Sequence, residues 1–325
     1  MYSSRVIESA SGSQKFQLQC KGLNGLGPEW VPLQQDWSNR WCTLTERFTD
    51  EFVKRIQDFK TRSSDVFVVT FIKSGTTWMQ ELAWLLLNQI DLNGARNSDL
   101  LQRSPFLEES GLHPVALDSI ATCDKIQSNP RLIKSHLPAQ LLPQEIWTQD
   151  RKVIYVARNP RDVVVSTFHY YTGLKISNCS LDDFVDFFIA DKVVFSTYWT
   201  HVIDFYRMRN EENVFFVTYE EMKRDLENVV RRLSRFLGCQ QLSDSEVEKL
   251  VNHLSFKNMK GSNFVNYTAL QGYNNLNDNF QFMRRGIVGS YKDELSSDSQ
   301  NKINKWTESF LQEYGIAESD IFGHL

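Results

Sequence analysis

The chain has 325 residues, of which 41% are hydrophobic and 13% aromatic, and its formal net charge at pH 7 is -4. This apolar content suffices for a large core, whereas the acidic balance argues against bulk binding of nucleic acid, which usually needs a basic excess. Five cysteines without a C-x-x-C pair argue against a disulfide framework or a zinc site and favour reduced thiols in the cytoplasm. Because residues 1–27 contain no apolar signal or anchor stretch, we expect no association with a membrane.

Residues 1–28 are polar and rich in Ser, Gly and Gln, which predicts a flexible N-terminal arm followed by a single domain over 29–325. Within this domain an amphipathic helix is expected over 47–60, because phenylalanine and isoleucine recur there at helical spacing. The β-favouring run 66–70 and the apolar run 78–90 then predict a strand, a tight loop and a helix.

The rest of the chain alternates between strands and helices. Residues 91–130 show weak periodicity and are expected to form loops with short helices. Further strands are predicted at 131–134, 153–157 and 214–217, and the helix after the last of these should end at Gly238. Strands that alternate with helices predict an α/β fold, here a single domain with a parallel sheet flanked by helices.

Chemically suggestive residues follow each predicted strand directly. They are Lys73, the pair Lys134 and His136, Arg158, and Tyr219. Because ligands of parallel α/β sheets bind at the carboxyl ends of the strands, we expect these side chains to meet in one site.

The loop after the first of these strands reads Lys73, Ser74, Gly75, Thr76, Thr77 and Trp78. Such a strand–loop–helix presents backbone N–H groups and a helix dipole to an anion, and the lysine and hydroxyl side chains add charge and donors. The lysine precedes the glycine, so the loop lacks the Gly-Lys-Ser/Thr order that a P-loop kinase or ATPase requires. The order Lys-Ser-Gly-Thr-Thr-Trp instead resembles the 5′-phosphosulfate loop of the cytosolic sulfotransferases.

The segment Lys-Ser-His-Leu-Pro at 134–138 carries a second signal. Transfer of a group to a hydroxyl needs a side chain of near-neutral pKa to take the proton, and histidine suits this task best. A neighbouring lysine can stabilise charge on the transferred group. The segment resembles the Lys-x-His-Leu-Pro motif of the same family, which implies that His136 is the catalytic base and that Lys134 and Lys73 are catalytic as well.

A third segment begins where Arg158 leaves a buried strand, and Ser166 follows in the next helix. The guanidinium fork suits phosphate oxygens, and the serine supplies one further donor. From this segment alone, an ion pair between Arg158 and Asp162 that caps the strand end is an equally good interpretation. The arrangement resembles the family's 3′-phosphate site, with Arg158 and Ser166 at the matching positions.

A fourth segment begins with Arg284, Arg285 and Gly286 and continues as a G-x-x-G-x-x-K loop. Adjacent arginines and a glycine loop can enclose a phosphate with side chains and backbone amides. The segment resembles the family's C-terminal signature Arg-Lys-Gly-x-x-Gly-Asp-Trp-Lys. It departs from that signature at Arg285, Ser290 and Tyr291, of which the first keeps the charge and the last keeps an aromatic ring.

An adenine ring needs aromatic faces and polar edges. Trp78 follows the phosphosulfate loop, and Tyr219 matches a family tyrosine at the adenine edge. The stretch that resembles the family's Thr-Ser-Phe-x-x-Met motif begins with Leu in place of Thr, and its matching residues are Leu254, Ser255, Phe256 and Met259.

These matches run in family order from about residue 64 to 292, and the chain therefore resembles the cytosolic sulfotransferases. The front end and the altered C-terminal signature resemble insect members, including the retinol dehydratase type, and Phe71-Ile72 stands where the family commonly has Tyr-Pro. The resemblance implies a P-loop-like phosphosulfate site and transfer of a sulfuryl group from 3′-phosphoadenosine 5′-phosphosulfate, without a metal. The acceptor would be a small lipophilic hydroxyl compound or amine that attacks in line, with Ser166 holding Lys73 back until it arrives.

The sequence says less about the acceptor and about the oligomeric state than about the nucleotide site. Aromatic candidates for an acceptor pocket are Trp30, Trp37, Phe106, Phe168, Tyr170 and Tyr171, of which we assign Phe106 and Phe168, together with Lys134 and His136, to acceptor binding. Two alternatives stay open: a catalytically inactive protein that binds the desulfonated product PAP, and sulfonation of an allylic alcohol followed by loss of sulfate. The family's dimer segment Lys-x-x-x-Thr-Val-x-x-x-Glu aligns with Lys292, Ser296, Ser297 and Asn301, which lack its apolar and acidic contacts, so we expect a monomer or a dimer that uses another surface.

Overall fold

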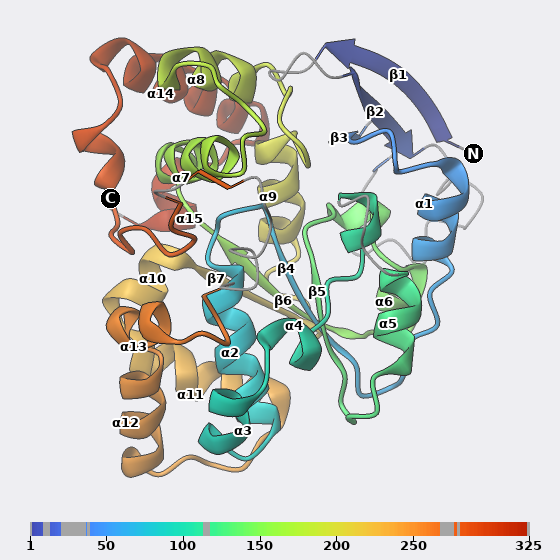
Figure 1. The fold of residues 1–325 in the computed structure, drawn as a ribbon, viewed down its shortest axis with the longest axis vertical. Helices are drawn as coiled ribbons and strands as arrows, with labels where there is room; N and C mark the ends of the chain where they lie inside the picture. Colours follow the sequence, from blue (N-terminus) through green and yellow to red (C-terminus); the bar gives the residue numbers. More distant parts are fainter. Residues whose placement is uncertain are drawn as a thin grey trace.

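The computed structural model describes residues 2–8, 14–20, 37, 40–112, 118–266, 276–277 and 280–323. A four-stranded parallel sheet lies at its centre, in the order β5-β4-β6-β7 (Figure 1). These strands span Leu132–Ser135, Val66–Thr70, Lys152–Ala157 and Val214–Thr218. The predicted strands and the predicted α/β class are confirmed.

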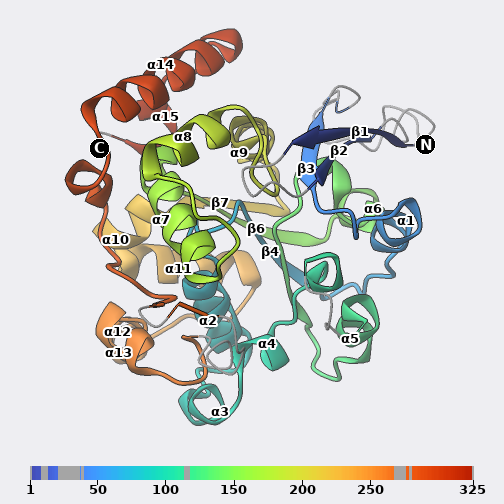
Figure 2. The ribbon, with the colours of Figure 1, turned by 45° about the horizontal axis from the view of Figure 1, so that its top comes forward.

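The central sheet is buried on both faces, which is why its strands read as continuous apolar runs. Successive side chains of a strand point to opposite faces. In β4, Val66 and Val68 belong to one hydrophobic cluster, whereas Phe67 and Val69 belong to another. The sheet therefore separates two cores, each covered by its own helices (Figure 2).

The first core is covered by the helices that follow β4 and β7. They are α2 (Thr76–Leu87), α3 (Leu92–Asn97), α4 (Leu100–Arg103), α10 (Tyr219–Arg224), α11 (Leu226–Leu237), α12 (Asp244–His253) and α13 (Phe256–Gly261). The predicted end at Gly238 is confirmed, since this residue has φ 76° and caps α11. The helix predicted after β7 is broken at Asp225, because that carboxylate accepts a hydrogen bond from Asn228 N and starts a new helix.

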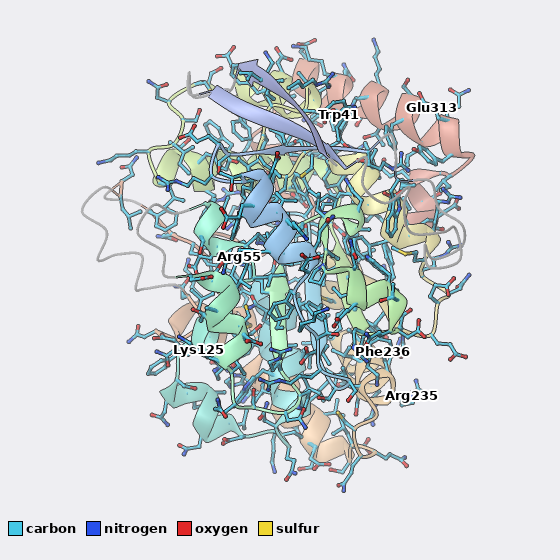
Figure 3. All side chains as sticks on the ribbon, turned by 90° about the vertical axis from the view of Figure 1, so that its right-hand side faces the viewer. Trp41, Arg55, Lys125, Arg235, Phe236 and Glu313 are labelled. Carbon is cyan, nitrogen blue, oxygen red and sulfur yellow. The ribbon has the colours of Figure 1, made fainter. Side chains whose placement is uncertain are left out.

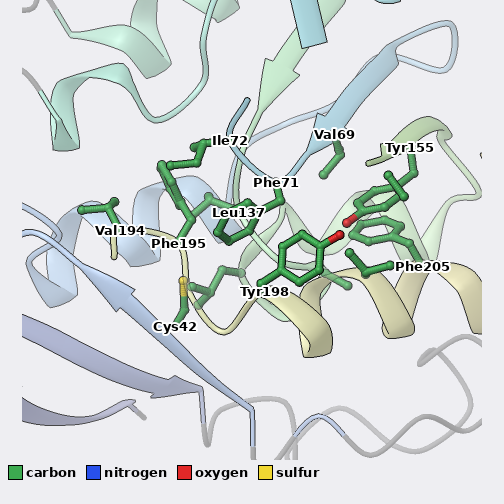
Figure 4. Packing of buried hydrophobic residues seen from close by; sticks show 14 of the residues in the cluster. Cys42, Val69, Phe71, Ile72, Leu137, Tyr155, Val194, Phe195, Tyr198 and Phe205 are labelled. Carbon is green, nitrogen blue, oxygen red and sulfur yellow. The ribbon is translucent and has the colours of Figure 1, made fainter. Parts of the chain in front are cut away.

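The second core is larger and richer in aromatic rings. Its helices are α1 (Asp50–Gln57), α5 (Ser119–Lys125), α6 (Gln144–Thr148), α7 (Pro160–Gly173), α8 (Leu181–Ile189), α9 (Tyr198–Arg207), α14 (Ser297–Tyr314) and α15 (Glu318–Phe322). Tyr155 on β6 stacks on Phe205 of α9 with 4.1 Å between ring centroids, next to Phe71 and Tyr198 (Figure 4). This packing fixes the sheet beneath the loops that follow its strands.

A three-stranded antiparallel sheet is formed by β1 (Tyr2–Glu8), β2 (Gln14–Cys20) and β3 (Trp41–Leu44), on the side of the molecule that carries α1 (Figure 3). The sequence analysis did not anticipate β1 and β2, which lie within the arm expected at 1–28. The alternation of apolar and polar residues in the β2 sequence was the available signal. The boundary at residue 28 falls outside the described residues and stays a prediction.

No helix in the described part of the chain combines the length and the apolar character that a membrane span needs.

Candidate active site

Four residues that the sequence predicted for the site follow four neighbouring strands. His136 follows β5, Lys73 follows β4, Arg158 follows β6 and Tyr219 follows β7. Because these strands are parallel and adjacent, their carboxyl ends lie side by side at one edge of the sheet. A cavity of about 680 Å³ is lined by all four residues.

Every residue that the sequence analysis assigned to the site lines this cavity except Ser74 and Phe168. Ser74 is fully buried in the loop between β4 and α2. Phe168 packs against Phe184 at 5.7 Å between ring centroids and is not among the lining residues, so its assignment to acceptor binding stays a prediction.

Of the other aromatic candidates, Tyr170 and Tyr171 line the cavity as expected. Trp37 is 2% exposed and packs against Trp147, so it belongs to the core. Trp30 lies outside the described residues.

The loop after β4 is held by its glycine. Gly75 has φ 104° and caps α2, and a Cβ at this position would lie 2.8 Å from the ring of Tyr219. A side chain here would displace that ring, so only glycine lets the loop approach it. The loop thus leaves the first backbone amides of α2 at the cavity, where they can bind an anion.

His136 is held by its backbone as well as by its ring. Nδ1 lies 2.9 Å from the carbonyl oxygen of Thr70 and 3.2 Å from its Oγ1. Since a carbonyl can only accept, Nδ1 carries the proton and Nε2 is left as the basic nitrogen. The backbone N–H of His136 donates to Glu108, and its carbonyl accepts from Nε2 of His201 at 3.0 Å.

The charge state of His136 follows from its surroundings. Burial, together with the nearby charge of Lys134, lowers the pKa of His136 well below its usual value. The imidazole is therefore neutral at neutral pH, as a general base has to be.

The two lysines of the site are also perturbed. Burial and the charges of Arg158, Lys134 and Arg284 lower the pKa of Lys73 to about 7. Burial lowers the pKa of Lys134 to about 8, although the carboxylates of Glu108 and Glu109 oppose this shift. An anion bound in the cavity would therefore favour the protonated, positively charged forms of both lysines.

The ammonium groups of both lysines face aromatic rings. Lys134 Nζ lies 4.1 Å from the ring centroid of Phe106. Lys73 Nζ lies 4.6 Å from the ring centroid of Tyr170 and 4.0 Å from that of Phe282. Among the described residues no hydrogen bond joins Lys73 to Ser166, although both line the cavity.

Arg158 connects the loop after β4 to the start of α7. Its Nη1 donates to the carbonyl oxygen of Lys73 at 3.1 Å, and its guanidinium lies 4.4 Å from the ring centroid of Tyr219. The ion pair with Asp162 that the sequence left open is long, at 3.9 Å. The structure therefore shows the ion pair only as a long contact, and the phosphate site at Arg158 stays a prediction.

Asp162 has a different principal role. Its carboxylate is buried and accepts hydrogen bonds from Gly289 N at 2.7 Å, Tyr291 N at 3.1 Å and Ser290 Oγ at 3.2 Å. It thereby anchors the C-terminal glycine loop to α7. The hydroxyl of Ser290, which stands where the family signature has Asp, takes part in this anchor.

A carboxylate also organises the two arginines of the glycine loop. Glu294 lies 2.7 Å from Nη1 of Arg284 and 3.5 Å from Nη1 of Arg285, and its other oxygen contacts Nε2 of His169. Arg285 pairs in addition with Asp293 at 2.6 Å. The arginines are thus oriented by acidic residues of their own segment.

A pair of aromatic rings and a second glycine define the remaining wall. The rings of Trp78 and Tyr219 meet edge to face at 5.6 Å between centroids. Gly286 has φ 63°, and a Cβ there would lie 2.2 Å from the ring of Phe256. The aromatic residues that the sequence assigned to adenine therefore lie in one wall of the cavity, together with the glycine loop.

The sequence analysis missed Asp162 as the anchor of the glycine loop, Glu294, Lys223 and Phe282. Lys223 lines the cavity from α10. Nothing in its local sequence distinguished it from an ordinary surface lysine. Phe282 stands directly before the arginine pair, and its place in that segment was the available signal.

The lining fits the nucleotide that the resemblance implies. Among the described residues it contains six lysine and arginine side chains and one carboxylate, that of Glu109. Three buried donors, Ser74 Oγ, Trp78 Nε1 and Arg158 Nε, have no hydrogen-bond partner in the described structure. Buried donors are normally satisfied, so their presence beside a basic cavity indicates an anionic ligand.

Comparisons with known proteins agree with this geometry. A family model described as the sulfotransferase domain matches residues 63–315. The luciferin sulfotransferase of Photinus pyralis is 32% identical over 80% of this chain and 75% of its own length. The amine sulfotransferase of Oryctolagus cuniculus is 32% identical over 85% of this chain and 90% of its own length.

Solved structures of sulfotransferases and of retinol dehydratase are also similar to this chain. Retinol dehydratase in complex with androsterone and the inactive cofactor PAP covers 98% of both chains with a TM-score of 0.81, and at 23% identity it shows the shared fold. The mouse sulfotransferase SULT7A1 complexed with PAP is 27% identical, with a TM-score of 0.65, and covers 82% of this chain and 92% of its own. With a family domain over most of its length and relatives more than 30% identical, the chain belongs to the sulfotransferase family of enzymes.

Proposed function

We propose that this enzyme transfers a sulfuryl group from 3′-phosphoadenosine 5′-phosphosulfate to a hydroxyl, or an amine, of a small lipophilic acceptor, with His136 as the general base. The nucleotide supplies the activated sulfuryl group. The observation that carries the proposal is the hydrogen bond from His136 Nδ1 to the backbone carbonyl of Thr70, which leaves Nε2 unprotonated in a basic cavity.

In this proposal His136 takes the acceptor's proton at Nε2. Its neutral form is favoured by burial and by the charge of Lys134, so the base needs no prior deprotonation at neutral pH. The carbonyl of Thr70 then stabilises the imidazolium that forms, because it accepts a hydrogen bond from the Nδ1–H.

Lys73 and Lys134 supply positive charge where negative charge develops. Electrostatic stabilisation by preoriented charges is usually a large contribution to group transfer. The backbone amides of α2, Arg158, Ser166 and Arg284 would hold the phosphates of the nucleotide. The stretch 254–259, with Trp78 and Tyr219, would hold its adenine ring. That no metal takes part stays a prediction.

The acceptor would occupy the part of the cavity lined by apolar side chains, among them Leu101, Phe106, Leu112, Val194 and Phe195. Such a lining favours a lipophilic compound with few polar groups. Androsterone and retinol are bound by retinol dehydratase, which shares this fold. A cytoplasmic location and the oligomeric state stay predictions.

The first test is calorimetric titration of the protein with PAP, with ATP as the control nucleotide. We expect micromolar or tighter binding of PAP and far weaker binding of ATP. Absence of PAP binding, or a preference for ATP, would overturn the proposed donor.

The second test is the variant His136→Ala, assayed with 3′-phosphoadenosine 5′-phosphosulfate and a panel of lipophilic alcohols, phenols and amines. We expect kcat to fall by roughly 10²–10⁴-fold, whereas PAP affinity should be unchanged. His253→Gln is the matched control, since His253 is partly buried but outside the lining. A His136→Ala enzyme that keeps more than about a tenth of kcat would contradict the base assignment.

The same panel separates the two alternatives. PAP binding without turnover of any acceptor would favour an inactive binding protein. Mass analysis of the organic product distinguishes a sulfate ester from an alkene, which would indicate sulfonation followed by loss of sulfate.

A further inference from the structure

The backbone of His136 continues past the end of the central sheet and is held there by side chains. β5 ends at Ser135, so His136 lies outside the ladder of the sheet. Its buried N–H and C=O groups nevertheless need hydrogen-bond partners. The N–H donates to Oε1 of Glu108, and the carbonyl oxygen accepts from Nε2 of His201 at 3.0 Å. Two buried side chains therefore fix the peptide groups on both sides of the proposed base.

The tautomer of His201 follows from its two partners. A carbonyl oxygen can only accept, so Nε2 of His201 carries the proton, and Nδ1 is left as an acceptor. The hydroxyl of Tyr155 lies 2.8 Å from this Nδ1 and 3.2 Å from the carbonyl oxygen of His201, so the shorter contact is the one to the ring. Burial lowers the pKa of His201 to about 4, which keeps the ring neutral at neutral pH. His201 thus has the opposite tautomer to His136, whose proton is on Nδ1.

Aromatic rings enclose the imidazole of His201 and the ring of Tyr155. Phe71 meets the imidazole edge to face at 5.7 Å between ring centroids, and Phe205, four residues later on α9, lies 6.0 Å from it. Phe205 also stacks on Tyr155 (Figure 4). His201 is 1% exposed and Tyr155 is fully buried. The imidazole and the hydroxyl are therefore held in place by the aromatic core that β6 and α9 share.

The helix that carries His201 also contacts the end of a second strand. Tyr198 precedes His201 by three residues and lies on the same face of α9. Its hydroxyl donates to the carbonyl oxygen of Arg158, which follows β6 just as His136 follows β5. One helix therefore fixes the backbone of two residues that line the cavity.

We propose that His201, itself held by Tyr155, is a positioning residue for the base: its Nε2–H fixes the carbonyl of His136 and so keeps the imidazole against the carbonyl of Thr70. Neither His201 nor Tyr155 is among the residues that line the cavity, so both act on the reaction only through His136. Without this hydrogen bond the backbone of His136 is freer, and Nε2 spends less time in the orientation that an acceptor proton requires. This inference rests on the proposed function, because it gives His201 a role only if His136 is the base.

The first test needs no turnover. In ¹⁵N-histidine-labelled protein without ligand, long-range ¹H–¹⁵N spectra show which nitrogen of each ring is protonated. We expect the proton on Nε2 in His201 and on Nδ1 in His136, with the signals assigned by their loss in His201→Phe and His136→Ala. In His201→Phe the two nitrogen signals of His136 should move toward each other, because both tautomers become populated. His253→Gln is the matched control and should leave them in place, since His253 pairs with Glu81 outside the lining.

The second test is steady-state kinetics. His201→Phe keeps a ring but removes the donor, so we expect kcat to fall roughly ten- to hundredfold, the range for a buried carbonyl left without a partner. The affinity for PAP should stay near the wild-type value. His201→Gln should recover most of the loss, because its amide N–H can donate to the same carbonyl. Tyr155→Phe should lower kcat less than His201→Phe does. Tyr206→Phe is its control, since that hydroxyl donates to the carbonyl of Asp320, away from the cavity.

The acid limb of kcat/KM separates positioning from a loss of stability. Titratable groups that face His136 are Lys134, Lys73, His201 and Glu108. Burial is the largest effect that lowers the pKa of His136, and the charges of the two lysines add to it. A freer His136 is better solvated, so its pKa rises and the acid limb should move to higher pH in His201→Phe. Destabilisation alone would reduce the amount of active enzyme without moving this limb.

The proposal is overturned if Nε2 of His201 is unprotonated in the wild-type protein, or if His201→Phe leaves the His136 signals and the acid limb unchanged. Equal losses of kcat in His201→Phe and His201→Gln would also overturn it, because the hydrogen bond would then not be the cause. If His201→Phe does not fold, the wild-type tautomers and the Tyr155→Phe variant decide. Failure of the proposed function would look different: PAP would not bind, or His136→Ala would keep its kcat, while the spectra would still report on the hydrogen bonds.

Discussion

The backbone carbonyl of Thr70 accepts a hydrogen bond from Nδ1 of His136 across 2.9 Å, and this contact decides which nitrogen of the ring can act as a base. Thr70 is the last residue of β4, and His136 is the first residue after β5. The two strands are hydrogen-bonded neighbours, so the parallel sheet itself sets the histidine's tautomer.

The side chain of Thr70 offers a test of how much this contact matters. Its Oγ1 lies 3.2 Å from His136 Nδ1 and 2.6 Å from Thr76 Oγ1. Thr70→Val removes this oxygen but keeps the carbonyl, so we expect kcat to fall only about two- to tenfold, the size of one net hydrogen bond. Steady-state kinetics measure this, with Thr122→Val on α5 as an exposed control. A loss as large as that of His136→Ala would mean that the hydroxyl, not the carbonyl, holds the ring.

The pKa shifts predict a narrow pH profile for kcat/KM. The pKa of His136 is well below 6.5, so the acid limb should lie below pH 6.5, where the base becomes protonated. The pKa values of Lys73, about 7, and Lys134, about 8, place the alkaline limb where these cations lose their charge. We expect Lys73→Arg, which stays protonated, to remove the lower of the two alkaline steps. An acid limb above pH 6.5 would contradict the assigned state of His136.

Two glycines of the C-terminal loop form a matched pair. Gly286 and Gly289 have φ 63° and 78°, so alanine is strained at both. A Cβ would lie 2.2 Å from the ring of Phe256 at Gly286, whereas nothing lies within 4 Å at Gly289. We therefore expect Gly286→Ala to weaken PAP binding by at least about tenfold, or roughly 1.4 kcal/mol, and Gly289→Ala to weaken it much less. Calorimetry with PAP checks this, and equal losses would show that backbone strain, not the ring, is responsible.

The ion pair of Arg131 and Asp65 is the stability test. Nη2 lies 2.5 Å from Oδ2, and both side chains are 0% exposed. Arg131→Met leaves a buried carboxylate without its partner, so the free energy of unfolding should fall by about 3–5 kcal/mol. Arg55→Ala removes an exposed pair with Asp118 and should cost no more than about 1 kcal/mol. Arg55 lies at the surface, near the end of α1 (Figure 3). Urea unfolding measures both, and a similar effect of the two variants would contradict this ranking.

The central sheet could be predicted because its strands are short and buried on both faces. Runs such as Val66–Thr70 and Val214–Thr218 are continuously apolar, as buried parallel strands are. They do not alternate with polar residues, so they cannot be mistaken for strands with one face in water. The hairpin of β1 and β2 was missed because their composition is polar and their pairing with β3 is long-range. The direction of Phe168 could not be read from the sequence: Ser166 and Tyr170, its neighbours on α7, line the cavity, whereas Phe168 packs against Phe184.

The sequence by itself determined which residues follow the strands: Lys73, His136, Arg158 and Tyr219 come directly after apolar runs, so local pattern sufficed to place them at one edge of a parallel sheet. Only the tertiary structure decided how they are held. The carboxylate of Asp162 and the rings of Tyr170 and Phe282 contact partners from separate segments of the chain. Such contacts depend on distances that folding creates, and no local spacing in the sequence encodes them.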